Sequence, residues 1–541
     1  MATALERRGL ELEPAPEGKL ITRIHVVNLD VFQSDSGFLQ HLNVLHSTTR
    51  EYVIGRELLL RPGDRWRDEL VRESERNLRD PFLSSLAVIV PVKSGMRGSV
   101  DLLVVTRDVW SLRTNSEFEI QEGRFTKLTL ALAENNFLGT RNHISLIFDM
   151  DESEYALGPR YIDTNLAGTR MRLLLWPRLL FKRADDTFEG TQNEARLLYP
   201  LWSLASRWGF LLQADHKDNV ERVFQNFEVA TYDNPDTPEV EAIPQEYRMF
   251  EATLRAEATH AVGRSVKHHT TLGSELKSRR PRPLPEFVGS DEDARAFARD
   301  LFPRSEFTSA LVFRQRVFTP DFRTYRNIET YDLPEDIQIG PDFEIELAIG
   351  MQPLGSDSGF LRFNAKGKWV FDLWQQTHID IAAGVSGRYT GSALEDREVS
   401  FDLFGATPTI RRFARVIASA TMAFQTDVVD NKRFTVGGQT GLRGYDVGEF
   451  RGTSFFIGNI EMRTVPRPWW FTRIGAVAFW DVGDAADGTE NLSLKNDLGL
   501  GVRVLAPQTG ESIYRFDWAI PLQGSEAGFP GRLSFGYEQA F

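Results

Sequence analysis

Apolar and polar residues alternate along most of the chain after about residue 124. The alternation is clearest at positions 128–132, 144–150, 474–482, 498–504 and 514–522. A two-residue period predicts β-strands in which one face is apolar and the other can hold charge. The second face of the late segments carries Asp481, Arg503, Arg515 and Asp517. The pattern therefore predicts a large antiparallel β-domain over residues 120–541.

The first 115 residues have a different texture. Residues 1–19 mix charge, Pro and Gly and offer little to bury, so they predict a flexible tail. They also lack the apolar stretch of a signal peptide, and we expect either a mature chain or a misplaced start. Segments rich in β-branched residues at 21–32 and 99–105 flank a charged helical pattern at 68–79. A small α+β domain over residues 20–115 is expected.

Two arrangements would satisfy the alternating strands: a soluble sandwich with its apolar faces inward, and a membrane barrel with them outward. The predicted strands are long, roughly 10–14 residues against a usual ~5–6. Tight turns at 465–469 and 506–511 alternate with polar loops, predicted to be extracellular or folded over a rim, at 215–245, 276–303 and 319–341. This asymmetry is typical of outer-membrane barrels. The 422 residues from 120 to 541, shared among sixteen strands, give about 26 residues each.

Composition narrows the class of protein further. The 541 residues are 41% hydrophobic and 26% charged, and no run of ~18 uncharged apolar residues occurs, which excludes a helix-bundle membrane protein. A net charge of −13 disfavours nucleic-acid binding. The absence of cysteine removes thiol catalysis, cysteine-type zinc sites and disulfides. No histidine metal motif and no nucleophile elbow is present, so we expect no metal, no cofactor and no enzymatic activity.

The most specific segment is residues 434–463, FTVGGQTGLRGYDVGEFRGTSFFIGNIEMR. Within it, Leu442, Arg443, Gly444 and Tyr445 resemble the [V/I/L]-R-G-[F/Y] signature on the sixth extracellular loop of the BamA/TamA superfamily. These POTRA-plus-barrel proteins insert or translocate polypeptides at outer membranes. Five strand-like segments follow the loop, as the family topology requires: 453–464, 471–482, 495–506, 512–522 and 530–541.

The resemblance covers nearly the whole chain from residue 21 onward. Segments 56–64, 73–80 and 105–112 occur in the order expected for one POTRA domain, and 133–146 resembles the first barrel hairpin of the family. The resemblance thus implies a sixteen-stranded antiparallel transmembrane β-barrel over 120–541, preceded by one small α+β POTRA domain over 20–115.

The arginine of the loop motif needs a partner if water is limited inside a barrel. On the strand 473–482 the even positions are apolar, so Asp481 faces the lumen, where the resemblance places the acidic partner of Arg443. Glu461 lies on the lumen side of its own strand by the same parity and is the second candidate. We expect exchange of the charges of Arg443 and Asp481 to restore part of what either single change removes. The alternative is an exposed loop arginine beside an unrelated polar lumen residue.

The carboxy terminus carries a second motif. Leu533, Phe535, Tyr537 and Phe541 share one strand face, and a terminal aromatic residue after such a strand resembles the assembly signal of outer-membrane barrels. The resemblance accordingly implies a bacterial outer-membrane location with the POTRA domain in the periplasm.

The implied function is insertion of other β-barrel proteins through a lateral seam between the first strand, about Phe125–Glu134, and the last, about Pro530–Phe541. The expected partners are unfolded outer-membrane β-barrel clients, outer-membrane lipid including lipopolysaccharide, and periplasmic chaperones or accessory proteins, with no nucleic acid. Alternatives are a polypeptide translocator of the two-partner-secretion type and, in a different class, a passive outer-membrane channel. An outer-membrane enzyme would need a polar catalytic cluster that the sequence does not contain.

Overall fold

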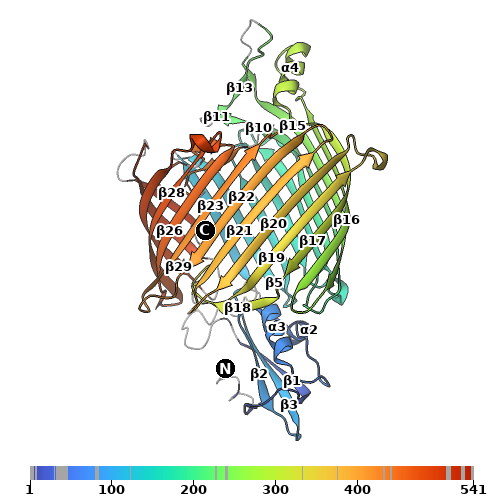
Figure 1. Cartoon of the computed structure of the whole chain (residues 1–541), viewed down its shortest axis with the longest axis vertical. Helices are drawn as coiled ribbons and strands as arrows, with labels where there is room; N and C mark the ends of the chain where they lie inside the picture. The colour runs from blue at the N-terminus through green and yellow to red at the C-terminus, as the bar shows by residue number, and fades with distance from the viewer. Residues whose placement is uncertain are drawn as a thin grey trace.

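The computed structural model consists of a small α+β domain at one end of a large β-barrel (Figure 1). It describes residues 5, 9–29, 31, 47–79, 84–121, 124–225, 228–237, 242–331, 333–374, 376–429, 433–438, 441–446, 448–506, 513–524 and 531–537. Within these ranges, no helix is both long and apolar enough to cross a membrane.

The α+β domain is built on a three-stranded sheet in the order β1-β3-β2, made of β1 (Leu20–Leu29), β3 (Ser99–Asp108) and β2 (Ser84–Lys93). β1 runs parallel to β3, and β2 runs antiparallel to it. Two helices, α2 (Glu51–Arg56) and α3 (Asp68–Leu78), cover one face and bury Ile54, Val71 and Leu78 against the sheet. The amphipathic pattern predicted at 68–79 is thus a helix that packs on the sheet.

The amino-terminal segment is not simply a flexible tail, as the sequence suggested. Leu12 forms an antiparallel bridge with Val92 of the edge strand β2, and the amide of Glu13 donates to the carbonyl of Pro91 at 3.0 Å. An edge strand exposes unpaired backbone groups. Residues 11–13 satisfy two of them, the carbonyl of Pro91 and the amide of Lys93, which the charge and proline content of the segment did not reveal.

The barrel sheet continues from strand to strand in chain order, with antiparallel pairing throughout the registers of the described residues. Its long strands are β4 (Leu112–Gln121), β5 (Arg124–Phe137), β6 (Asn142–Met150), β7 (Glu154–Asp163), β8 (Arg172–Lys182), β9 (Phe188–Tyr199), β10 (Trp208–Arg222), β15 (Glu246–Val262), β16 (Lys267–Arg282), β17 (Glu306–Phe318), β19 (Glu335–Gly350), β20 (Phe360–Asp372), β21 (His378–Tyr389), β22 (Leu394–Ala406), β23 (Ala414–Thr426), β26 (Ser454–Thr464), β28 (Thr472–Ala486), β29 (Lys495–Leu505), β30 (Ile513–Pro521) and β31 (Arg532–Tyr537). The last strand, β31, lies beside the first, β4.

The expectation of sixteen strands is not met. Across the described residues the barrel sheet comprises 22 strands, or 20 when the short β18 (Asp321–Tyr325) and β27 (Arg467–Trp469) are left out. The estimate allowed too many residues per connection, since β6 and β7 are joined by residues 151–153 alone. It also missed β4, which begins at Leu112, inside the segment assigned to the first domain. The first strand of the barrel is therefore β4 and not 125–134.

The two faces of the barrel wall differ as the parity predicted. Apolar side chains of the outer face are exposed, among them Leu132 (52%), Leu500 (58%) and Phe516 (49%). The intervening positions of the same late strands, such as Arg503, Arg515 and Asp517, are buried inside. A sandwich would have buried the apolar face between two sheets, so that alternative is wrong.

The connections at the two ends are unequal. At the end away from the α+β domain, residues 223–245 form the short strands β11 (Phe224–Gln225), β12 (Glu228–Val229), β13 (Thr231–Tyr232) and β14 (Ile243–Pro244), and residues 283–305 contain α4 (Asp291–Leu301). The strands β24 (Phe434–Val436) and β25 (Phe450–Gly452) pair within the 427–453 connection. Among the residues that the structure describes, there are also three 3₁₀ turns: η2 (Leu166–Gly168), η3 (Gln352–Leu354) and η5 (Thr489–Asn491).

One predicted extracellular loop lies at the opposite end. Residues 319–334, between β17 and β19, stand on the side of the α+β domain, where Asp336 pairs with Arg79 of that domain at 2.7 Å. Part of a second predicted loop, residues 276–282, is the end of strand β16. Charge and proline content marked both segments as loops but gave no information about the end of the barrel on which they fall.

Candidate functional site

The connection between β23 and β26, residues 427–453, folds into the barrel and carries the Leu-Arg-Gly-Tyr motif. Leu442 and Tyr445 are fully buried and pack in a cluster with Val436 and Ala485. Gly441 has φ +111°, and a Cβ atom there would lie 2.5 Å from the Ile457 side chain. The glycine is needed because the loop both turns and approaches the wall closely.

Arg443 ends in a pocket of acidic side chains on the inner wall. Its Nε and Nη2 donate to the two carboxylate oxygens of Asp481, at 2.8 and 2.7 Å. Its Nη1 donates to Glu461 at 2.6 Å and to Asp517 at 3.2 Å. The guanidinium also stands over the ring of Phe479, 3.4 Å from the centroid. The structure therefore brings both predicted partners of Arg443 to it, and adds a third carboxylate and a ring.

The two residues after Arg443 are held as well. The amide of Gly444 donates to Asp497 at 2.9 Å, and a Cβ at Gly444 would be only 2.7 Å from Cβ of that aspartate. The Tyr445 hydroxyl donates to the carbonyl of Gln523 at 2.7 Å. Each residue of the motif thus contacts a different part of the wall formed by β26, β28, β29 and β30, which fixes the loop at several points.

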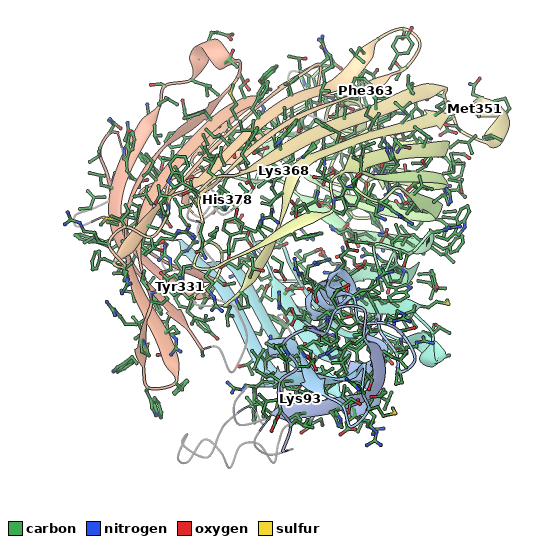
Figure 2. The ribbon with its side chains drawn as sticks, turned by 60° about the horizontal axis from the view of Figure 1, so that its bottom comes forward. Lys93, Tyr331, Met351, Phe363, Lys368 and His378 are labelled. Carbon is green, nitrogen blue, oxygen red and sulfur yellow. The ribbon has the colours of Figure 1, made fainter. Side chains whose placement is uncertain are left out.

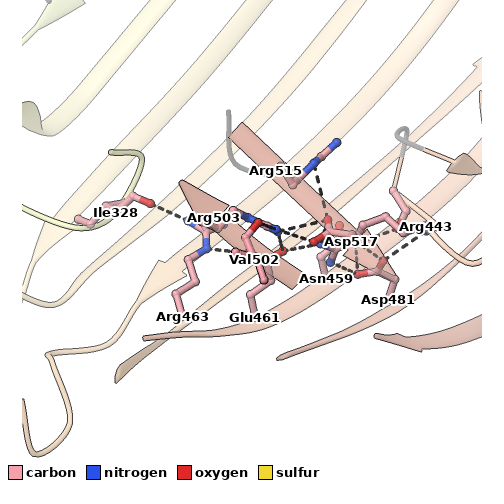
Figure 3. A network of polar contacts seen from close by, with 11 residues as sticks. Ile328, Arg443, Asn459, Glu461, Arg463, Asp481, Val502, Arg503, Arg515 and Asp517 are labelled. Carbon is pink, nitrogen blue, oxygen red and sulfur yellow. Dashed lines mark hydrogen bonds and ion pairs between the residues drawn. The ribbon is translucent and has the colours of Figure 1, made fainter. Parts of the chain in front are cut away.

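A wider ionic network surrounds these contacts (Figure 3). Glu461 also accepts from Arg463 at 2.6 Å, while Asp517 pairs with Arg503 and, at 3.6 Å, with Arg515. The cluster comprises four arginines, Arg443, Arg463, Arg503 and Arg515, and four acidic residues, Glu461, Asp481, Asp497 and Asp517, all at most 3% exposed. Buried charges are tolerated when they are paired and hydrogen-bonded, and here the two signs balance.

The network reaches a second segment that crosses the domain-side mouth of the barrel. We call residues 319–334 the strap. Arg463 donates to the carbonyl of Ile328 at 2.6 Å, and Arg415 donates to the carbonyls of Arg326 and Asn327 at 2.8 and 3.2 Å. Near its far end is Tyr331, which is labelled in Figure 2. Tyr331 packs with Leu505 and Ile513 of the carboxy-terminal strands. The strap therefore connects the β17–β19 wall to the wall that holds the loop.

The carboxy-terminal motif is only partly within the described residues. Leu533 is 86% exposed, and Phe535 stacks edge to face on Phe516 with ring centroids 4.7 Å apart. Tyr537 is paired with Tyr514 in the backbone register, while Phe541 lies outside the described residues. Leu533 and Phe535 thus belong to the outer apolar face, in line with the predicted shared face.

Sequence reasoning found the centre of the site and missed its surroundings. Arg503, Arg515 and Asp517 were placed on the inner face by parity, but nothing along the chain indicated that they meet Arg443. The strap was predicted as part of a polar loop, but its position across the domain-side mouth and its contacts with the network were not predicted. Within the described part of the chain, no group of three His, Asp or Glu side chains could hold a metal ion. The chemistry of this cluster is ion pairing and hydrogen bonding, which positions a loop.

Comparisons with known proteins find one family domain and several similar solved structures. Residues 338–541 match the Omp85 superfamily domain. Similar solved structures include BamA from Haemophilus ducreyi lacking POTRA domains 1-3, with 10% identity and a TM-score of 0.36, covering 96% of this chain and 84% of that one. CdiB from Acinetobacter baumannii (11%, 0.40, covering 97% and 74%) and CdiB from Escherichia coli (12%, 0.41, covering 98% and 79%) are also found. No curated protein sequence matches. The match thus identifies an Omp85 superfamily domain in the carboxy-terminal part of this chain, residues 338–541.

Proposed function

We propose that this protein is an outer-membrane assembly factor that inserts β-barrel client proteins, with its α+β domain acting as a periplasmic POTRA domain. The observation that carries the proposal is the Omp85 superfamily domain at residues 338–541, combined with a motif loop clamped to the inner wall through Arg443. The exposed apolar outer face of the strands supports placement in a lipid bilayer. No catalytic role is assigned to any residue.

The physical problem that such a factor solves is the edge of a growing sheet. Lipid offers no hydrogen bonds, so each unpaired backbone group costs several kcal/mol in the membrane core. A host barrel that opens between its first and last strands can pair an incoming client strand instead. We infer that the seam is between β4 and β31, because these strands are neighbours in the ring and far apart in the chain.

The loop and the strap have a place in this proposal. The loop braces the wall of β26, β28, β29 and β30, which lies next to the seam, so this wall keeps its shape while the seam opens. The strap, the motif loop and their buried ion pairs occupy the lumen in the described structure, which argues against a passive channel.

The test is reconstitution of the full chain in liposomes with an unfolded outer-membrane barrel as client. Faster client folding than in empty liposomes is expected. Release of an unfolded polypeptide across the bilayer, without its insertion, would support the translocator alternative. Ion conductance with no effect on any client would support a channel, and either result would overturn the proposed insertion activity.

A disulfide across the seam tests the mechanism separately. The chain has no cysteine, so one cysteine in β4 and one in β31 form the only disulfide. We expect insertion to stop in the oxidised protein and to return on reduction. A matched disulfide between β9 and β10, which pair over residues 191–199 and 210–218, should leave activity unchanged. Full activity with the β4–β31 bond formed would rule out this gate.

A further inference from the structure

A groove runs over the outer face of the barrel, where strands β21, β22, β23, β26 and β28 lie side by side (Figure 1). Its volume is about 330 Å³. The floor is made of small residues, Gly405, Ala418, Ala420 and Gly458, and the walls include Leu403 and Trp480. Gly405 is paired with Ala418, and Ala420 with both Leu403 and Gly458, so these residues share one face.

The groove faces away from the lumen. Leu403 and Trp480 are 49% and 40% exposed, on the same side of the wall as the outer apolar residues. Neighbouring side chains do not fill the floor at Gly405, because a Cβ atom there would meet nothing within 4 Å. A strip of small side chains between large ones therefore leaves the floor of the groove open. We call this open strip over Gly405, Ala418, Ala420 and Gly458 the furrow.

Directly below the groove, on the side of the α+β domain, two adjacent turns carry arginines. Residues 407–413 join β22 to β23 and contain Arg411 and Arg412, and residues 465–471 join β26 to β28 and contain Arg467. The turns touch, because the amide of Val465 donates to the carbonyl of Phe413 at 2.7 Å. All three arginines are exposed, and neither turn contains an acidic residue.

The charge of these turns is unusual for this chain. The net charge of the protein is −13, yet among the residues the structure describes no ion pair neutralises Arg411, Arg412 or Arg467. The same two turns carry the exposed aromatic residues Phe413 (60%), Trp469 (67%) and Trp470 (76%), and the turn between β20 and β21 carries Trp374 (69%). Exposed Trp beside arginine is the composition of a membrane–water boundary, where the aromatic ring sits at headgroup level and the cation meets phosphate.

We propose that the groove and the two turns form one binding site for an anionic glycerophospholipid. The arginines of the turns bind its phosphate-containing headgroup, and one acyl chain lies in the furrow over Gly405 and Ala418. The inference rests on the proposed function to the extent that it needs the barrel in a membrane with the α+β domain in the periplasm. The domain-side leaflet is then the inner one.

The dimensions agree with this occupant. A strand rises about 3.3 Å per residue, so Ala418 and Ala420 lie roughly 15–25 Å along β23 from Phe413. This matches the path of an acyl chain from the boundary into the hydrocarbon core, whose half-thickness is about 15 Å. The furrow has almost no polar lining: of the residues that line it, only Ser419 and Asn459 carry polar side chains, and the Asn459 amide donates to Asp481 on the lumen side. A client polypeptide would leave backbone groups unpaired there, which favours lipid.

The experiment is a titration of the purified full chain in non-ionic detergent with phosphatidylglycerol or phosphatidylcholine, scored by native mass spectrometry. Arg411→Ser with Arg412→Ser is expected to weaken phosphatidylglycerol binding by about tenfold to thirtyfold, and to leave phosphatidylcholine binding unchanged. The matched control is Arg207→Ser with Arg264→Ser, two exposed arginines on domain-side turns elsewhere on the barrel. It should have no effect on either lipid.

A second variant tests the furrow. Gly405→Leu fills it without a backbone clash and should weaken both lipids by at least about threefold, while Ala256→Leu on the exposed face of β15 should weaken neither. The proposed site would be overturned if the Arg411→Ser/Arg412→Ser variant bound phosphatidylglycerol as tightly as the Arg207→Ser/Arg264→Ser control. It would also be overturned if Gly405→Leu had no effect on lipid binding. Tighter binding of lipopolysaccharide than of phosphatidylglycerol would also overturn it, because that lipid belongs to the other leaflet.

Cross-linking of the unchanged protein provides the result if a variant does not fold. Phosphatidylglycerol with a photoreactive acyl chain should label residues 403–405, 418–420 or 458–460, and labelling confined to other strands would contradict the proposal. None of these readouts uses a client protein. Loss of client insertion with intact lipid binding would thus reject the proposed function alone, and the reverse result would reject this site alone.

Discussion

Arg443 and Asp481, 38 residues apart in the chain, face each other with two parallel hydrogen bonds of 2.8 and 2.7 Å, between a guanidinium and a carboxylate that are both buried. This bidentate geometry fixes the direction of the arginine as well as its distance. Because Arg443 belongs to the loop and Asp481 to β28, the pair determines where the loop sits on the wall. The neighbouring carboxylates of Glu461 and Asp517 then share the same guanidinium.

Arg443→Ala should lower the free energy of unfolding by about 3–5 kcal/mol, since it leaves buried carboxylates without their cation. The measurement is urea unfolding of the protein in lipid vesicles. The control is Arg433→Ala in the same loop. Arg433 pairs with Asp487, but both are well exposed, so this change should cost less than about 1 kcal/mol. Equal effects of the two changes would show that the buried cluster does not stabilise the protein.

Exchange of the two charges should fail to rescue the protein, contrary to what the sequence alone suggested. In Arg443→Asp with Asp481→Arg, the new aspartate would face Glu461 and Asp517 without a cation between them. Asp481 also accepts from Asn459 at 2.8 Å, a bond that an arginine cannot accept. The double variant should thus be no more stable than Arg443→Ala in the same urea titration. A gain of more than about 1 kcal/mol would mean that the pair acts independently of the cluster.

Gly444→Ala should displace the loop, because the added methyl would come within 2.7 Å of Cβ of Asp497 and 3.0 Å of the Pro521 backbone nitrogen. Overpacking of this kind costs about 1–3 kcal/mol. Protease sensitivity of residues 427–453 in the intact barrel measures the displacement. Gly359→Ala is the matched control, since its Cβ would meet only a backbone oxygen at 3.9 Å. Unchanged protection in Gly444→Ala would show that the loop tolerates a wider gap.

The sequence predicted those parts of the structure that depend on local periodicity. The five strands after the loop, the lumen side of Asp481 and Glu461, and the outward face of Leu533 and Phe535 all follow from a period of two, because a strand alternates its side chains whatever its neighbours are.

What the sequence did not predict depends on contacts between distant segments. Each long strand runs from one end of the barrel to the other, so the end at which residues 319–334 lie depends on the number of strands before them. A single missed strand, β4, moves the predicted position to the opposite end. The meeting of Arg463 with Ile328, 135 residues apart, has no local signal at all. The strand number failed for the same reason, since it is a property of the whole ring.

The strap gives a prediction in which one side chain is changed in two ways. The Tyr331 hydroxyl is buried against Gly475 and has no hydrogen-bond partner among the described residues. Tyr331→Phe should therefore be neutral or slightly stabilising, whereas Tyr331→Ala should cost about 3–5 kcal/mol through lost packing on Leu505 and Ile513. Urea unfolding of both variants decides. A large loss in Tyr331→Phe would show that the hydroxyl is bonded, and no loss in Tyr331→Ala would show that the strap is not held there.

The last prediction concerns how the α+β domain is held to the barrel. Arg79 on the domain pairs with Asp336 of β19 at 2.7 Å, and nearby the guanidinium of Arg76 lies 4.5 Å from the ring centroid of Phe322 in the strap. Both ionic side chains are partly exposed, at 23% and 17%, so a double-mutant cycle of Arg79→Ala and Asp336→Ala should give a coupling energy of only about 0.5–1 kcal/mol. The cycle is measured on the equilibrium between docked and undocked domain, followed by distance labels in the two parts. The bond between Arg79 and Glu75 lies within the α+β domain, so its loss in Arg79→Ala should not by itself shift the docking equilibrium. A coupling energy of zero, with docking intact in every variant, would assign the attachment to the other contacts between domain and barrel, such as the amide of Arg50 on the carbonyl of Gly139 and the pairing of Glu57 with Arg170.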